Sequence, residues 1–206
     1  MNSNQLRIVG GVAAVVFVCW LAFAGLHRRT VMTRSNDGLI HVDFYGESLC
    51  PDCRHNVLDV LDPMFENGIA KNMKLRYIAY GKVRDGKCQH GELECKYNRY
   101  INCAQDLWPR QEEWFPYVKC LAKDLQNIDA MAADCAVAQH WNPKDLDSCA
   151  QGDRGAKLEQ EAGQATTSLE PKLTFVPWVI VNGVLLGQDF ENLARYVCAA
   201  NTDDDR

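Results

Sequence analysis

Residues 39–65 read LIHVDFYGESLCPDCRHNVLDVLDPMF, and this stretch decides the fold. Its first seven residues, Leu39–Tyr45, are mostly apolar, β-branched or aromatic, which predicts a buried strand. A helix is expected from Pro51, because the N–H that proline lacks would have no partner in a first helical turn. Apolar residues then recur at helical spacing until Asn67-Gly68 ends the helix. A Cys-x-x-Cys motif therefore stands between a buried strand and a helix.

The two cysteines of this motif are Cys50 and Cys53, and Cys50 is expected at the cap of the helix. Unpaired N–H groups and the helix dipole favour a thiolate at that position. Cys50 is therefore predicted to attack a substrate disulfide, and Cys53 to resolve the mixed disulfide. Pro51 and Asp52 are predicted to modulate the pair, since the carboxylate of Asp52 opposes a nearby thiolate and favours a reducing potential.

The chain beyond the motif continues the pattern of an α/β protein. Met73–Tyr80 is a second predicted strand, and Leu173–Val181 is a third, rich in β-branched and aromatic residues. An Asn-Gly turn then predicts a hairpin to Val184–Leu186. A final helix capped by Asp189 is expected to follow. Strand, helix and strand, followed by a hairpin and a helix, predict a thioredoxin-like fold.

The two halves of this fold are separated by about ninety residues, 81–170, with many helix formers. The segment is too long for a loop and is interpreted as an inserted helical subdomain within a domain spanning 39–199. Helices are expected near Glu92–Ala104, Gln111–Gln126, Asn127–Gln139 and Gly155–Ser168. The aromatic residues on these helices are expected to be core rather than a substrate surface.

Pro177 lies near the start of the third predicted strand. In thioredoxin-like folds a cis proline faces the Cys-x-x-Cys pair, and the preceding residue docks extended substrate through its backbone. Val176 and Pro177 are therefore candidate docking residues. The alternative is an ordinary proline at a strand edge.

The composition excludes some functions and indicates a compartment. The chain has 206 residues, 47% of them hydrophobic, and a net charge of −5, so nucleic acid is not expected as a partner. Ten cysteines in a chain of this length indicate an oxidising environment.

The N-terminus agrees with such an environment. Residues 1–24 are predicted to be a signal peptide, cleaved after Ala24, and 25–38 a linker. An uncleaved anchor reaching to about residue 26 is the alternative, in which case the protein is bound to a membrane. Residues 200–206 are expected to be an acidic tail.

A second cysteine-rich segment, residues 88–103, reads CQHGELECKYNRYINC. Its spacing matches no usual zinc-finger pattern, so structural disulfides are the expectation in an oxidising lumen. The pattern Cys-Gln-His-Gly-x-x-Glu-Cys-x-x-Asn-x₄-Cys, together with the Cys-x-x-Cys pair, resembles the gamma-interferon-inducible lysosomal thiol reductase family. The resemblance extends over roughly Leu39 to Cys198.

The resemblance implies a thioredoxin-like fold with a disulfide-stapled helical insertion, and reduction of protein disulfides without an organic cofactor or metal. Cys50 matches the attacking cysteine and Cys53 the resolving one. His90, Glu94 and Asn98 are expected to be hydrogen-bonding supports. The structural disulfide candidates are Cys88, Cys95, Cys103, Cys120, Cys135, Cys149 and Cys198. Seven is odd, so one free thiol or one intermolecular bond is expected, and the pairing stays open.

The expected partners are disulfide-containing protein substrates and an electron donor that is a small thiol or a protein. The expected location is the lumen of the secretory pathway, with delivery to lysosomes or endosomes or to the outside of the cell. Two alternatives to a reductase remain. One is a disulfide oxidase or isomerase of the early secretory pathway, and the other is a non-catalytic module stabilised by disulfides or zinc.

Overall fold

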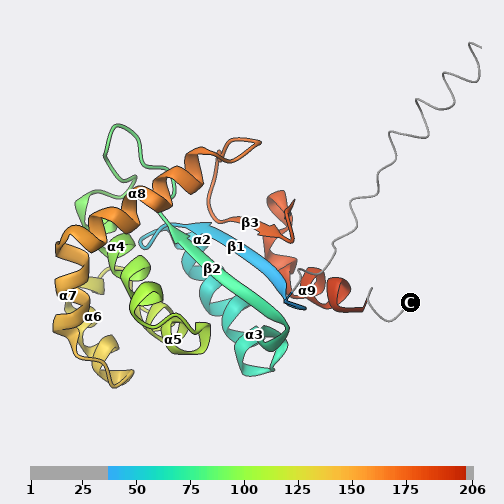
Figure 1. Cartoon of the computed structure of the whole chain (residues 1–206), viewed down its shortest axis with the longest axis horizontal. Coiled ribbons are helices and arrows are strands. Elements are labelled where there is room, and N and C mark those ends of the chain that lie inside the picture. The colour runs from blue at the N-terminus through green and yellow to red at the C-terminus, as the bar shows by residue number, and fades with distance from the viewer. Residues whose placement is uncertain (1–36, 203–206) are drawn as a thin grey trace, which may run out of the picture. The chain divides into compact units, whose positions relative to one another are not determined.

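A computed structural model describes residues 37–202 of the chain (Figure 1). The predicted signal peptide, most of the predicted linker and the end of the predicted acidic tail lie outside the described residues. None of the helices within 37–202 has the length and apolar character needed to cross a membrane.

Four strands form one sheet in the order β2-β1-β3-β4. β1 (Ile40–Gly46) pairs in parallel with β2 (Met73–Ala79), so that Phe44 lies opposite Tyr77. β3 (Trp178–Val181) pairs antiparallel with β1, and the short β4 (Val184–Leu185) closes the hairpin. The first two strand predictions and the hairpin are confirmed.

One helical segment joins β1 to β2. It begins as α2 (Pro51–His55), continues through a π-helical stretch (Asn56–Leu61) and ends as α3 (Asp62–Glu66). A short 3₁₀ turn (Ile69–Asn72) leads into β2. Asn67 caps α3 at its C-terminus and Gly68 has a positive φ of 84°, which confirms the predicted end of the helix.

Two predictions near the C-terminus are corrected. The third strand begins at Trp178 rather than Leu173, because Pro177 has no N–H to donate to a strand ladder. Asp189 does not cap the final helix. It lies inside a 3₁₀ segment (Gly187–Asn192), and α9 (Leu193–Thr202) begins after it. The carboxylate of Asp189 instead accepts hydrogen bonds from side chains in this turn and in α9.

Five helices lie between β2 and β3 and are stapled by three disulfides (Figure 1). They are α4 (Glu92–Leu107), α5 (Gln111–Ala122), α6 (Ile128–Ala138), α7 (Pro143–Gln151) and α8 (Asp153–Thr167). The bonds are Cys88–Cys95, Cys103–Cys149 and Cys120–Cys135. The disulfide-stapled helical insertion is therefore present, and α7 is a helix that the sequence analysis missed.

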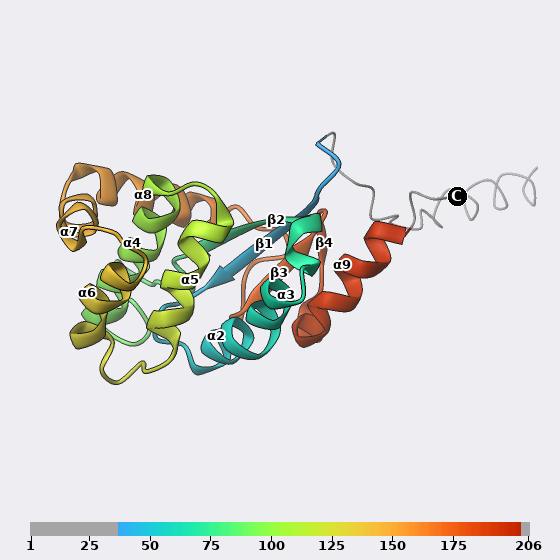
Figure 2. The ribbon, with the colours of Figure 1, turned by 90° about the horizontal axis from the view of Figure 1, so that it is seen from below.

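The strands direct side chains into two clusters on opposite faces of the sheet. Ile40, Val42 and Phe44 point into the main core, which includes α2, α3 and α9 on one side of the sheet (Figure 2). Tyr45 and Trp178 point the other way and pack against α8. The aromatic residues Trp114, Phe115 and Tyr117 of α5 are buried in the main core, as expected.

Candidate active site

Cys50 and Cys53 lie where the sheet meets the N-terminus of α2. Cys50 is the N-cap, with extended backbone angles, and its sulfur accepts a hydrogen bond from the backbone N–H of Cys53 at 3.4 Å. Pro51 occupies the first helical turn, where its missing N–H leaves no partner unsatisfied. Cys50 is 5% exposed and Cys53 1% exposed, and both are free thiols. The two cysteines therefore form a dithiol with unequal access to solvent.

The surroundings shift the pKa values of the two thiols in opposite directions. The pKa of Cys50 is lowered, first by a hydrogen bond with the side chain of Cys53 and then by the backbone N–H groups of Cys53 and Asp52. Burial and the negative charge of Glu47 partly oppose that lowering. Burial raises the pKa of Cys53 well above its ordinary value, and the interaction with Cys50 adds to the increase. Cys50 is therefore the more acidic thiol of the pair.

The candidate docking residues lie beside Cys50. The Val176–Pro177 peptide bond is cis, and the carbonyl oxygen of Val176 is 4.0 Å from the sulfur of Cys50. Val176 and Pro177 are both buried and lead directly into β3. The role of these residues in docking substrate stays a prediction.

The helix α4 braces the loop that precedes Cys50. The side-chain oxygen of Asn98 accepts a hydrogen bond from the backbone N–H of Ser48 at 2.8 Å. The hydroxyl of Ser48 donates to the backbone carbonyl of Glu94 at 3.0 Å. All three residues are buried. Glu94 and Asn98 are thus hydrogen-bonding supports in the structure, and they act on the loop that carries Cys50.

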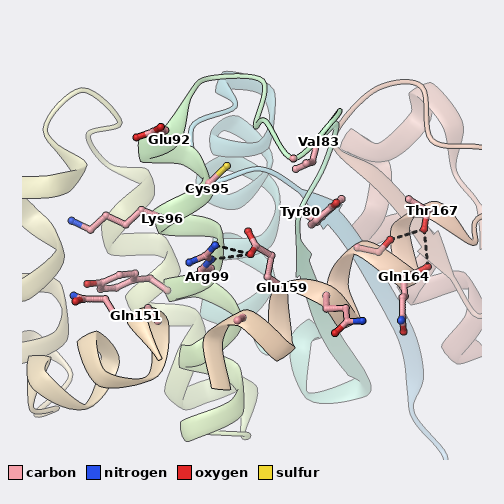
Figure 3. Close-up of a pocket in the computed structure, with 16 residues that line it drawn as sticks. Tyr80, Val83, Glu92, Cys95, Lys96, Arg99, Gln151, Glu159, Gln164 and Thr167 are labelled. Carbon is pink, nitrogen blue, oxygen red and sulfur yellow. Dashed lines mark hydrogen bonds and ion pairs between the residues drawn. The ribbon is translucent and has the colours of Figure 1, made fainter. Parts of the chain in front are cut away.

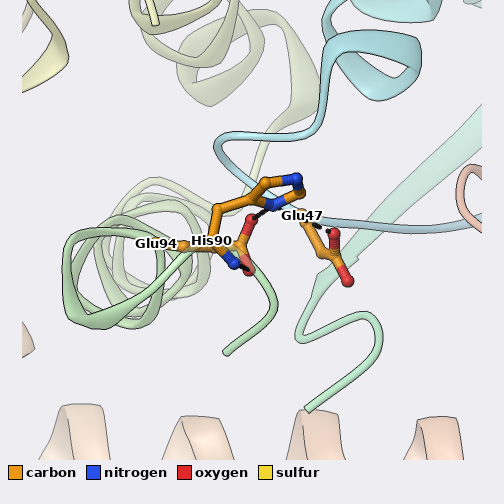
Figure 4. A group of neighbouring side chains, drawn as sticks. All are labelled: Glu47, His90 and Glu94. Atoms are coloured by element: carbon orange, nitrogen blue, oxygen red, sulfur yellow. Dashed lines mark hydrogen bonds and ion pairs between the residues drawn. The ribbon is translucent and has the colours of Figure 1, made fainter. Parts of the chain in front are cut away.

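Glu47 is a site residue that sequence reasoning missed. Its side chain is buried, one carboxylate oxygen accepts from the backbone N–H of Lys82 at 2.6 Å, and the other lies 3.6 Å from Nδ1 of His90 (Figure 4). Burial is the main cause that raises the pKa of Glu47. Nδ1 of His90 also contacts Glu94. The only sequence signal was a charged residue in the turn between a buried strand and the Cys-x-x-Cys motif.

The same three side chains are a group that could hold a metal ion. One ligand atom from each of Glu47, His90 and Glu94 can be chosen so that all lie within 4.8 Å of one another. The sequence analysis assigned no metal ligand.

Two other predicted residues stand apart from the dithiol chemistry. Asp52 is exposed on the first turn of α2, and its backbone N–H favours the Cys50 thiolate. The carboxylate charge that opposes the thiolate comes from Glu47, so the effect assigned to Asp52 stays a prediction. Cys198, counted among the disulfide candidates, is instead an exposed free thiol on α9, because the other six candidates pair among themselves.

A large hollow lies on the insertion rather than at the dithiol. It has a volume of about 870 Å³ and runs between α4 and α8, with Tyr80 at one edge (Figure 3). An ion pair between Arg99 and Glu159, 2.8 Å long, joins the two helices inside it. The lining includes neither Cys50 nor Cys53.

The fold is similar to those of solved oxidoreductases. BdbD from Bacillus subtilis, in its oxidised form, has a TM-score of 0.61 and 13% identity, over 82% of this chain and 91% of that one. DsbA from Chlamydia trachomatis has a TM-score of 0.60 and 14% identity, over 81% of this chain and 89% of that one. The chain therefore has the thioredoxin-like fold of these proteins, with a dithiol at a helix N-terminus.

The sequence comparisons identify the family. The family model of gamma interferon inducible lysosomal thiol reductase (GILT) matches residues 41–139. The gamma-interferon-responsive lysosomal thiol protein of Arabidopsis thaliana is 28% identical over 82% of this chain and 74% of its own length. The gamma-interferon-inducible lysosomal thiol reductase of Mus musculus is 30% identical over 77% of this chain and 66% of its own length. The chain belongs to the gamma-interferon-inducible lysosomal thiol reductase family.

Proposed function

We propose that the protein reduces disulfide bonds in protein substrates through Cys50 and Cys53. The observation that carries this proposal is the asymmetry of the dithiol. Cys50 caps α2 with a lowered pKa, while Cys53 is buried with a raised one. A nucleophile is therefore available while the second thiol is held in reserve.

The reaction follows from that asymmetry. The Cys50 thiolate attacks one sulfur of the substrate disulfide, forming a mixed disulfide and releasing the other substrate sulfur as a thiolate, which takes a proton from water. Cys53 then loses its proton and attacks the sulfur of Cys50, which releases the second substrate thiol and leaves a Cys50–Cys53 disulfide. Two electrons from a small thiol or a protein dithiol restore the starting pair.

The proposed docking site for substrate is Val176 and Pro177, beside the dithiol. The carbonyl oxygen of Val176 lies beside the sulfur of Cys50. The next residue, Pro177, has no backbone N–H, and the peptide bond between the two residues is cis. An extended, unfolded polypeptide can align its own N–H groups with such a carbonyl. We therefore propose that the substrates are disulfides in unfolded or flexible segments of proteins.

The proposed location is the lumen of the secretory pathway, with lysosomes, endosomes or the cell exterior as destinations. Three intramolecular disulfides within residues 37–202 support an oxidising compartment. The names of relatives from plants and mammals include the word lysosomal, which supports the acidic destination.

The test is reduction of insulin by the wild type and three variants, at pH 4.5 and pH 7, with a small-thiol donor. The wild type and Cys198→Ser should reduce insulin, and Cys50→Ser should not. Cys53→Ser should accumulate a mixed disulfide that is visible by mass spectrometry. Activity that survives in Cys50→Ser refutes the assignment of the attacking cysteine.

One observation favours a second candidate, an oxidase or isomerase that uses the same cysteines. The lowered pKa of Cys50 stabilises the thiolate of the reduced form, and a stabilised reduced form makes the disulfide more oxidising. Equilibration with glutathione measures the potential. A value near about −180 mV or higher favours the oxidase or isomerase, and one of about −230 mV or lower favours the reductase.

A further inference from the structure

We propose that Glu47, His90 and Glu94 form a binding site for one zinc ion beside the dithiol. The site lies next to the dithiol, since the charge of Glu47 acts on Cys50, but the proposal does not depend on the direction of the exchange. It assigns a second role to two residues, His90 and Glu94, that the family resemblance marked only as supports.

The three ligands come from segments that the fold brings together. Glu47 lies in the loop between β1 and α2, His90 in the loop before α4, and Glu94 in the first turn of α4 (Figure 4). Their donor atoms already lie within 4.8 Å of one another, and Glu47 Oε2 is 3.6 Å from Nδ1 of His90. Tetrahedral ligands at zinc distances of about 2.0–2.1 Å lie about 3.4 Å apart, so the ion fits after small side-chain adjustments, in which Nδ1 of His90 moves away from Glu94, which it contacts directly, and slightly toward Glu47.

A second, independent feature points to a ligand at this place. Glu47 is 1% exposed, and its Oε2 atom has no hydrogen-bond donor, although its other oxygen is bonded to the N–H of Lys82. A buried carboxylate oxygen without a donor is unfavourable, and buried charges are normally paired or bound to metal. Oε2 of Glu47 faces His90, so the unused acceptor is aimed into the cluster (Figure 4).

Packing holds this acceptor in place. A Cβ atom added to Gly81 would lie 2.0 Å from Cγ of Glu47, so the backbone of Gly81 closes off the space on that side. Glu94 is held in a similar way, since its Oε1 accepts from the backbone N–H of His90 at 3.1 Å. Ligands that are fixed before the ion arrives lose little freedom on binding.

The charges and donor types favour zinc over magnesium and calcium. Two buried carboxylates carry two negative charges, which one dication balances in full. One imidazole nitrogen with two carboxylate oxygens is a zinc donor set that leaves a fourth position for water, whereas magnesium and calcium prefer six or more oxygen ligands. The His90 side chain is 32% exposed, which gives the ion a route from solvent.

Free thiols also bind zinc, so the experiment must remove them. The full chain would carry Cys19→Ser, Cys50→Ser, Cys53→Ser and Cys198→Ser, which leaves the six disulfide-bonded cysteines in place. Zinc is titrated at pH 7.5 by calorimetry, and binding of one ion per chain is expected. Calcium in place of zinc should bind at least tenfold more weakly.

Single substitutions in this thiol-free background then locate the site. Glu47→Gln and His90→Gln should each weaken zinc binding at least tenfold, while Glu92→Gln, an exposed neighbour on the first turn of α4, should leave the affinity unchanged. Circular dichroism confirms that each variant is folded. If Glu47→Gln does not fold, the His90→Gln variant alone tests the site, because His90 is partly exposed.

Two results overturn the proposal. One is the absence of zinc binding up to 1 mM, roughly the weak end of specific metal affinity. The other is binding that neither Glu47→Gln nor His90→Gln weakens. Because the insulin assay uses the native cysteines and this titration removes them, failure of the zinc site and failure of the reductase mechanism are told apart.

Discussion

Replacing both Cys103 and Cys149 with alanine should destabilise the protein more than removing either of the other disulfides. This bond joins α4 to α7 across a sequence separation of 46, compared with 15 for Cys120–Cys135 and 7 for Cys88–Cys95. A longer closed loop removes more entropy from the unfolded chain. The loop-entropy relation gives losses of about 4, 3 and 2.4 kcal/mol in that order.

The assay is urea unfolding at pH 7, followed by circular dichroism, with the remaining disulfides intact. The double variants should rank in the order of their loop lengths, with about 1.7 kcal/mol between the largest and the smallest loss. Burial adds in the same direction, because Cys103 is 0% exposed and Cys88 8%. Cys198→Ser serves as the control that leaves stability unchanged. A Cys88/Cys95 variant that loses as much stability as the Cys103/Cys149 variant refutes the reasoning.

Three further predictions concern the dithiol and its support. Iodoacetamide near pH 7 should label Cys50 before Cys53, because the lowered pKa of Cys50 leaves a larger fraction of Cys50 than of Cys53 as thiolate at that pH. Equal labelling of the two cysteines, measured by mass spectrometry, contradicts this prediction. Asn98→Ala should cost about 1–3 kcal/mol and slow insulin reduction, because the buried N–H of Ser48 loses its acceptor; an unchanged unfolding midpoint argues against the brace. Asp52→Asn should raise the reduction potential in a glutathione titration, and an unchanged value removes Asp52 from the tuning of the pair.

Local signals were enough to predict the elements around the motif. The β-branched and aromatic run before Gly46, and the proline after Cys50, each act within a few residues, so the strand and the helix start could be placed from the sequence. The third strand was placed too early because hydrophobic character continues through Pro177, while ladder pairing depends on an N–H that proline lacks. The hydrophobic pattern alone does not show that this N–H is missing.

The site could be predicted only where the spacing of residues in the sequence indicates its chemistry. Cys50 and Cys53 can be recognised from the Cys-x-x-Cys motif and its position between a strand and a helix. Glu47 does not, because a glutamate in a turn is ordinarily exposed and its burial depends on Gly81, which is 34 positions away in the sequence. The pairing of Cys103 with Cys149 and of Cys120 with Cys135 depends in the same way on how α4 packs on α7 and α5 on α6.

The contacts around Ser48 explain why the insertion and the Cys-x-x-Cys motif belong to one functional unit. Asn98 and Glu94 of α4 both hold Ser48, two residues before Cys50, so α4 is tied to the loop that leads into the cap of α2. The matched family region, 41–139, contains both of these segments but ends before Val176. α4 and the loop before Cys50 therefore form one assembly, while Val176 and Pro177 approach Cys50 from the start of β3. We therefore expect substitutions at Val176 and Pro177 to act directly at the Cys50 sulfur, and substitutions in α4 to act through the loop that carries Cys50.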